Sequence, residues 1–348
     1  MGEFEPLLLL VFLYKEIASA PCANMLLPNS TVVSHLYNST VLHIAKVPGT
    51  AAYKDLFERL GNKPAPASLS RFAQWQRWWN KKRGLPATPD VGVLASLLTA
   101  LRFAATEALA EPIDHVAVTR PAIPAITKLD LDDALEHAGL RGWLGDSGGS
   151  QPKHVFESQA SFAGNNHGLC DSYRDFMKCW DDASTRSRHV GLFISLTRHA
   201  LYASLDPMQG AFPHWSGVGP RMLDFSAGLD SRNHFASDSD YWTHIRTHIV
   251  ELVRQGSRMP DMLLLGGENG TERELLTTIR DAVALLKPAV SLDIDTAEIV
   301  DPTFAAARGM AFYARRRQEA PGHCVEWDGC DQEREKQRDR RDQERIEL

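Results

Sequence analysis

The sequence predicts an α/β protein with mixed sheets, because helix-like and strand-like segments alternate along most of the chain. Apolar residues recur every three or four positions in residues 71–83 and 94–108, which is the spacing of amphipathic helices. Short β-branched runs at residues 115–119 and 190–196 are typical of strands. Of the 348 residues, 43% are hydrophobic and 24% are charged, so the chain can bury a large core without a metal or a dense disulfide framework.

Two helices are expected before the first of these strands. In the earlier one, Phe72, Trp75 and Trp79 share one face, which we expect to pack inward while the basic side meets water. The alternative is contact with a nucleic acid or an anionic surface, because this helix combines Trp with Lys and Arg and has no acidic residue. The later helix, at residues 94–108, follows a proline-containing loop.

A strand, a turn and a helix are expected next. Two prolines end the strand at 115–119, because proline lacks a backbone donor. Thr127 and Asp130 have the spacing of a helix capping box, and Gly139 is a suitable C-terminal cap for the helix that follows.

The second half of the chain continues this alternation. Two β-prone runs joined by three residues, 190–196 and 200–205, predict a hairpin. Residues 207–239 are rich in Gly, Pro and Ser and are expected to be irregular. The other expected elements are a helix near 240–254, a strand at 261–265 running into Gly266 and Gly267, and helices near 271–286 and 302–317.

The N-terminal segment predicts secretion. An apolar run at residues 6–14 followed by small residues indicates a signal peptide over residues 1–20, and a buried N-terminal strand or helix is the alternative. The run is too short to cross a bilayer, which takes about 20 residues, so no transmembrane segment is expected. Three Asn-x-Ser/Thr sequons, at Asn29, Asn38 and Asn269, agree with a secreted or secretory-pathway glycoprotein.

Four of the five cysteines fall into two local pairs, Cys170 with Cys179 and Cys324 with Cys330. In an oxidising compartment each pair could close a short disulfide loop, whereas in a reducing one all five are unrelated thiols. The formal net charge of −6 argues against a general nucleic-acid binder. Residues 321–348 end in a highly charged tail, which we expect to remain solvated.

Two short motifs suggest chemistry that the rest of the sequence does not support. Ser147 lies in a Gly-Asp-Ser-Gly-Gly loop like that of serine proteases, but no His and Asp are placed as that mechanism requires, so a serine hydrolase is a remote alternative. Asp293 and Asp295 resemble the paired acids of haloacid-dehalogenase phosphatases, but they lie near the end of the chain and not after a first strand.

A third pattern has the spacing of metal ligands. Asp240, His244 and His248 recur every four residues on one face of a helix, an arrangement that zinc sites use. No further ligand is evident from the sequence, and the chain has 13 His. We therefore attribute the spacing to coincidence and expect no metal site.

Several blocks occur in the order of a known domain. The first block is a strand, a turn and a helix at residues 115–140, and the second is an acidic block at residues 155–169. A hairpin follows at residues 190–205. The last two are a strand with Gly-Gly and a helix at residues 261–283, and an Ala-rich closing helix at residues 299–317. Together they resemble the nucleotide-binding domain of the Hsp70 and actin superfamily of ATPases over about residues 90–317. Residues 71–90 are also similar to a group of secreted fungal proteins with a divergent form of this domain.

The resemblance implies a two-lobed fold of ribonuclease H-like subdomains that closes on ATP and a divalent metal. It implies a first lobe over residues 21–189 and a second over 190–320, with a short insertion near 207–258. Glu157 would occupy the position of the catalytic-site glutamate, although the residues alone favour a surface or helix-end carboxylate. Gly266, Gly267 and Glu268 would lie at the adenosine.

The sequence departs from this family at the phosphate-binding hairpins. Ile194 stands where the family has a metal-side Asp, and Leu196, Thr197 and Arg198 stand where it has glycines. Residues 37–47 would keep the strands of the first hairpin without its glycines. Side chains at these points block the backbone donors on which phosphoryl transfer depends.

These departures predict a pseudo-ATPase, a non-catalytic binding or structural module that needs no cofactor. Its partner would be an unidentified protein or small molecule. The alternative is an active, chaperone-like ATPase that binds ATP with Mg²⁺ through Glu157, Gly266 and Gly267. A glycan on Asn269 would crowd that same site.

Overall fold

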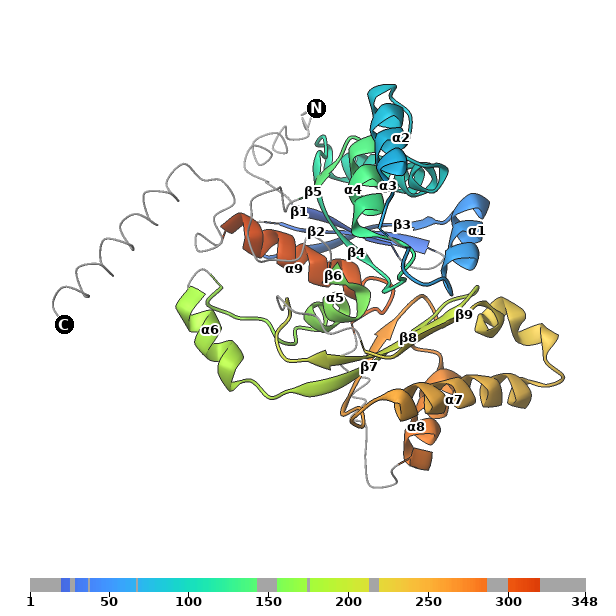
Figure 1. Ribbon diagram of the computed structural model, residues 1–348. Coiled ribbons are helices and arrows are strands. Elements are labelled where there is room, and N and C mark those ends of the chain that lie inside the picture. The colour runs from blue at the N-terminus through green and yellow to red at the C-terminus, as the bar shows by residue number, and fades with distance from the viewer. Residues whose placement is uncertain are drawn as a thin grey trace, which may run out of the picture.

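Two β-sheets, each with its own helices, make up a mixed α/β protein, as predicted (Figure 1). The computed structural model describes residues 20–25, 29–36, 38–66, 68–142, 155–173, 176–212, 219–286 and 300–319. Below, the N-terminal unit is the first sheet with α1 to α4, and the C-terminal unit is the second sheet with α7 and α8. Helices α5 and α9 lie between the two sheets.

The first sheet has six strands, in the order β3-β2-β1-β4-β5, with β6 also paired to β4. Its antiparallel β1–β2–β3 meander continues into a parallel β1–β4 pair. The strands are β1 (Ala20–Met25), β2 (Asn29–His35), β3 (Val41–Pro48), β4 (His115–Arg120), β5 (Arg141–Gly142) and β6 (Val155–Phe156). The prediction of a complete hairpin at residues 37–47 is wrong, because that segment contributes a turn and one strand, β3, to a longer meander.

Four helices belong to the N-terminal unit: α1 (Ala51–Leu60), α2 (Arg71–Lys82), α3 (Pro89–Leu109) and α4 (Lys128–His137). Apolar residues of α1, α3 and α4 pack with Val32, Val116 and Val118 on one face of the first sheet. Among the described residues, α3 is the one helix long and apolar enough to cross a membrane by length and composition. Its buried residues belong to this core, which accounts for the apolar composition.

Helix α5 (Glu157–Gly164) and helix α9 (Ala305–Glu319) cross each other between the sheets. Helix α9 covers the second face of the first sheet, although the expected boundaries assigned it to the second lobe. Every residue of α5 is buried. The two helices approach at small residues: a Cβ added to Gly164 would lie 1.8 Å from the Ala305 carbonyl oxygen, and one added to Gly309 would lie 1.8 Å from that of Ala160.

The second sheet has the order β10-β7-β8-β9. Its strands are β7 (His189–Leu196), β8 (Leu201–Met208), β9 (Arg221–Asp224) and β10 (Met262–Gly266). Helix α7 (Asp238–Gln255) and helix α8 (Arg273–Leu286) pack on one face, and Phe162 of α5 packs on the other. The predicted β7–β8 hairpin is confirmed, with Leu196 paired to Leu201 at its tip.

The remaining elements are short. They are α6 (Phe176–Thr185) and the 3₁₀ helices η1 (Phe225–Ala227) and η2 (Leu229–His234). In its described part, the segment expected to be irregular, residues 207–239, therefore contains β9, η1 and η2 between the end of β8 and the start of α7.

Local sequence signals account well for the helix at α4. Thr127 accepts a hydrogen bond from the Asp130 backbone, and the Asp130 carboxylate accepts one from the Thr127 backbone, so the predicted capping box is confirmed. Gly139 follows the helix with a φ of +67°, the left-handed conformation that glycine adopts without strain.

The α5–α9 contact predicts the effect of one methyl group. Replacing Gly309 by Ala in an open helix should stabilise the protein by up to about 1 kcal/mol through helix propensity. Because the new methyl would overlap the α5 backbone, we expect Gly309→Ala instead to lower the free energy of unfolding by about 2 kcal/mol or more. Urea denaturation measures this change.

Gly210→Ala is the matched control, because a Cβ at Gly210 meets nothing within 4 Å. It should change the free energy of unfolding by less than about 0.5 kcal/mol. A Gly309→Ala protein as stable as the wild type would contradict the close helix contact.

Candidate functional site

Glu157 lies buried where the two sheets come closest to each other. It is the first residue of α5, and strand β6 immediately before it fixes this position beside β4. Tyr53 of α1 and Tyr202 of β8 both interact electrostatically with its carboxylate. The Glu157 Oε1 atom has no hydrogen-bond partner among the described residues. The structure thus gathers three buried, ionisable side chains from three elements. Of the two positions considered for Glu157, the helix end is confirmed and the surface is wrong.

Burial controls the protonation of this group. Loss of solvent raises the pKa of Glu157 to about 8, because an isolated carboxylate is unstable in an apolar environment. The positive end of α5 offsets a small part of this cost. Burial also raises the pKa of both Tyr53 and Tyr202. At neutral pH the cluster therefore consists of a protonated acid and two phenols, all uncharged.

Three backbone N–H groups of the β7–β8 turn have partners within the chain. The Thr197 backbone N–H donates to the Ala200 carbonyl oxygen at 3.0 Å, and the Thr197 hydroxyl accepts from the Ala200 N–H at 3.1 Å. The Arg198 N–H faces Glu268 Oε1 at 3.4 Å. Ile194 is fully buried in the core beneath α7 and α8. The backbone N–H groups of Thr197, Arg198 and Ala200 thus already have partners within the chain.

The Gly266–Gly267 pair is explained by packing. A Cβ on Gly266 would lie 2.7 Å from the Phe193 ring, and one on Gly267 would lie 2.5 Å from the Leu196 carbonyl oxygen. That oxygen accepts a hydrogen bond of 3.1 Å from the Asn269 N–H. Both glycines thus allow β10 and its loop to pack tightly against β7, and no ligand is required to account for them.

Two side-chain contacts connect the N-terminal unit to the C-terminal unit. Lys46 of β3 forms an ion pair with Glu268, and Lys54 Nζ of α1 lies 2.7 Å from His199 Nε2. The Glu268 carboxylate, expected near an adenosine, is engaged in this ion pair. The residues in these positions therefore do not fit a bound Mg-ATP, because the donors and the glycines are already used within the chain.

The sequons differ in their accessibility. Asn38 is exposed in the turn before β3, where its Oδ1 accepts from the Thr40 N–H at 3.0 Å. Asn29 begins β2, and its side chain lies outside the described residues. Asn269 Nδ2 is buried without a described partner, and a glycan attached there requires an exposed amide nitrogen. In this conformation Asn38 can carry a glycan and Asn269 cannot.

One predicted disulfide is formed. Cys170 and Cys179 are bonded, with a Cα–Cα distance of 5.6 Å, which agrees with an oxidising, secretory compartment. Cys324, Cys330, Ser147 and the Asp293–Asp295 pair lie outside the described residues.

Helix α2 is turned the opposite way from the prediction. Its aromatic side chains point into solvent: Phe72 is 70% exposed, Trp75 54%, Trp78 49% and Trp79 45%. The residue that faces inward is Arg77, which is buried. The expectation that the aromatic face packs inward is therefore wrong.

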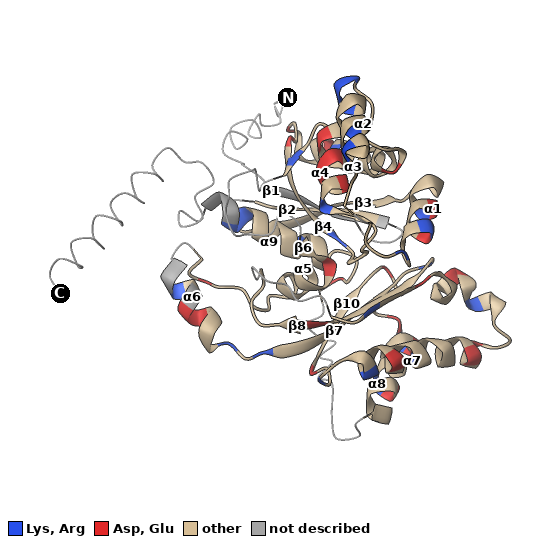
Figure 2. Ribbon diagram, viewed as in Figure 1, with Lys and Arg blue, Asp and Glu red and all other residues tan. Residues whose placement is uncertain are grey.

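The inward face of α2 is held by charge. Arg77 binds Asp133 at 2.6 Å and Asp130 at 2.9 Å, and Lys81 binds Asp133 at 2.8 Å and Glu136 at 2.5 Å. All three acids belong to α4, which lies beside α2 (Figure 2). A buried guanidinium with two carboxylate partners is hydrogen-bonded in its charged form, so the α2–α4 contact fixes the helix with its aromatic face outward.

The aromatic face itself is continuous. Centroids of the Trp75 and Trp79 rings are 6.1 Å apart, with nearly parallel planes, and Trp78 lies 5.8 Å from Trp79. Lys82 Nζ lies 5.9 Å from the centre of the Trp78 ring. We call the exposed side chains of this face the α2 patch: Arg71, Phe72, Trp75, Trp78, Trp79, Lys82 and Arg83. An exposed aromatic face of this kind is a candidate interaction surface.

The His pair on α7 has an acidic neighbour other than the one expected. Asp240 Oδ2 accepts from the Ser237 hydroxyl at the start of α7. The carboxylate that meets His244 and His248 is Asp224, the last residue of β9. Partial burial raises the pKa of Asp224, but hydrogen bonds from Ser226 and His244 outweigh this effect and lower it overall.

Comparison with known proteins does not assign the chain to a family. No protein-family model matches it, and no curated protein sequence is significantly similar to it.

The buried acid makes stability depend on pH. The folded state holds a proton on Glu157 up to about pH 8, whereas the unfolded state releases it near 4.5. The unfolded state therefore binds fewer protons between these values, and stability falls as pH rises through this window. Glu157→Gln cannot ionise, so its stability relative to the wild type should rise by up to about 4 kcal/mol across the window.

Urea denaturation at about pH 5 and about pH 8.5 measures this difference. Glu58→Gln is the control, because Glu58 is an exposed carboxylate of α1. It should show no such trend. An equal pH dependence in the wild type and in Glu157→Gln would show that Glu157 is not buried as described.

Proposed function

We propose that this chain is a secreted, non-catalytic binding module that uses a degenerate, two-lobed Hsp70/actin-like framework and attaches to anionic lipid surfaces through the α2 patch. The outward orientation of four aromatic side chains on α2 carries this proposal. Two sheets separated by the α5–α9 pair support the two-lobed framework, together with the order of the sequence blocks.

Loss of catalysis is supported by the contacts between the units. Phosphoryl transfer depends on a metal and on donors positioned around the phosphates, and loss of one stabilising donor can cost about 100-fold in rate. Here the Thr197 N–H is bonded within its own turn, and Glu268 is paired with Lys46. Glu157 is buried and protonated at neutral pH, so it is a poor general base.

ATP should therefore not stabilise the protein. A ligand that binds only the folded state stabilises it by RT ln(1 + L/Kd), where L is the free ligand concentration, so the melting temperature rises steadily with ligand concentration above the dissociation constant. We expect no change in melting temperature with millimolar ATP and Mg²⁺ compared with Mg²⁺ alone. A rise that grows with ATP concentration, and that Arg198→Glu abolishes, would instead favour the active ATPase that binds ATP with Mg²⁺.

The composition of the α2 patch favours a lipid interface. Trp side chains locate at the boundary between headgroups and acyl chains, where the ring is in an apolar region and the indole N–H meets water. Arg71, Lys82 and Arg83 flank the rings, and α2 contains no acidic residue. Helices with this pattern lie in the plane of anionic bilayers.

The position of α2 is also suitable for contact with a flat surface. It lies at the outer edge of the N-terminal unit, on the side away from the second sheet (Figure 1). Leu69 and Leu85, just beyond its two ends, are 36% and 46% exposed and extend the apolar surface. The patch can therefore reach a bilayer without any rearrangement of the core.

Vesicle binding tests this proposal. The protein should co-float with vesicles that contain phosphatidylserine and remain unbound with pure phosphatidylcholine. Binding should weaken as salt rises, because the electrostatic part is screened. The double variant Trp75→Ser with Trp79→Ser should lose at least about tenfold in affinity, since each Trp contributes more than 1 kcal/mol of apolar burial.

Phe103→Ser is the matched control, because Phe103 is an aromatic side chain of α3 that is also 70% exposed. It should bind vesicles like the wild type. Equal binding by the double variant would overturn the proposal. Tight binding to single-stranded nucleic acid without vesicle binding would favour base stacking on the same rings instead.

A further inference from the structure

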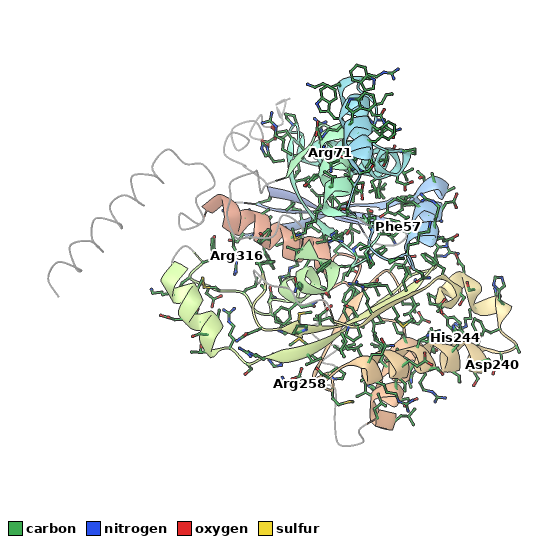
Figure 3. All side chains as sticks on the ribbon, viewed as in Figure 1. Phe57, Arg71, Asp240, His244, Arg258 and Arg316 are labelled. Atoms are coloured by element: carbon green, nitrogen blue, oxygen red, sulfur yellow. A yellow bond between two sulfur atoms is a disulfide. The ribbon has the colours of Figure 1, made fainter. Side chains whose placement is uncertain are left out.

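Three ligand-type atoms converge at one point between β9 and α7. His244 Nε2 lies 3.0 Å from Asp224 Oδ2, His248 Nε2 lies 3.1 Å from the same oxygen, and the two nitrogens are 3.1 Å apart. His244 and His248 are one helical turn apart on α7, and Asp224 ends β9. Figure 3 shows His244 on the side of α7 that faces this sheet edge, with Asp240 nearer the N-terminal end of the helix.

Hydrogen bonds alone cannot satisfy all three contacts. Each Nε2 atom either donates its single proton or accepts with its single lone pair. If both imidazoles donate to Asp224, two N–H groups face each other at 3.1 Å. If His248 donates to His244, the lone pair of His244 is used, and its contact with Asp224 joins two acceptors. With Asp224 ionised, one contact is therefore repulsive wherever the protons on the two Nε2 atoms are placed.

A cation between the three atoms makes every contact favourable. At the usual distance of about 2.0–2.1 Å from zinc to His nitrogen or carboxylate oxygen, ligand separations of about 3.1 Å correspond to angles of about 95–100° at the metal. Three ligands at such angles occupy one side of the ion. We propose that Asp224, His244 and His248 form a binding site for a divalent first-row transition-metal ion, Zn²⁺ in particular.

The surroundings orient the carboxylate for this role. Asp224 Oδ1 accepts hydrogen bonds from the Ser226 N–H at 2.7 Å and the Ser226 hydroxyl at 2.6 Å. This leaves Oδ2 directed at the two His. Hydrogen bonds of this kind commonly fix metal ligands in place. The Phe235 ring, 5.2 Å from His244 between centroids, packs against one of the two imidazoles.

The site is open on one side. The side chains of Asp224, His244 and His248 are 18%, 32% and 29% exposed, so a water molecule or an external ligand can reach the ion. Three protein ligands with an open position are typical of reactive zinc sites, whereas structural sites use four. Two imidazole nitrogens also disfavour Mg²⁺ and Ca²⁺, which prefer oxygen ligands.

Metal titration tests the site in the full chain. After removal of metals with a chelator, Zn²⁺ should raise the melting temperature of the wild type, and Co²⁺ should produce a visible absorption band. Mg²⁺ and Ca²⁺ should do neither. His248→Gln and Asp224→Asn should each weaken Zn²⁺ binding at least about tenfold, and each should remove the Co²⁺ band.

His115→Gln is the control, because His115 also contacts a carboxylate, Asp114, at 2.8 Å. It should bind Zn²⁺ like the wild type. The metal-free melting temperature of each variant reports whether it folds, and the Co²⁺ band of the wild type decides the question if one variant does not. Absence of both wild-type responses, or unchanged Zn²⁺ affinity in both folded ligand variants, would overturn the site.

Discussion

The close crossing of α5 and α9 is the constraint on which the rest of the structure depends. Gly164 and Gly309 let the two helix backbones touch, and this contact sets the separation between the two sheets. Because α5 is short and lies entirely inside, its first residue, Glu157, has no route to solvent. The contact that joins the two units therefore also desolvates Glu157, a carboxylic acid at their boundary.

Burial of charge at the α2–α4 contact explains why the aromatic face of α2 points into solvent. Arg77 and Asp133 are both buried at the α2–α4 contact, where the desolvation of each is compensated only by the other and by neighbouring partners. Loss of one member would leave an unpaired charge inside. This dependence holds α2 with its charged side inward, even though burial of the opposite, aromatic side would remove more apolar area from water.

Most elements were predictable because their signals are local. The capping box at Thr127 and the alternation of strands and helices need only neighbouring residues. The orientation of α2 was not predictable, because the partners of Arg77 lie more than fifty positions along the chain, on α4. Asp224 was missed for a similar reason: β9 has four residues in a Gly- and Pro-rich segment, so no strand signal placed it beside His244.

The Gly266–Gly267 pair shows why a family resemblance and a physical role must be separated. Glycine permits close approach of any atom, whether from a ligand or from the chain itself. Here Gly267 faces the Leu196 carbonyl, which accepts from the Asn269 N–H, so packing alone requires the glycine. Glycines at these two positions are therefore no evidence by themselves for a nucleotide-binding site. The α2 patch belongs to the N-terminal unit, whereas Asp224, His244 and His248 belong to the C-terminal unit. Either could therefore change without disturbing the α5–α9 contact that holds the fold together.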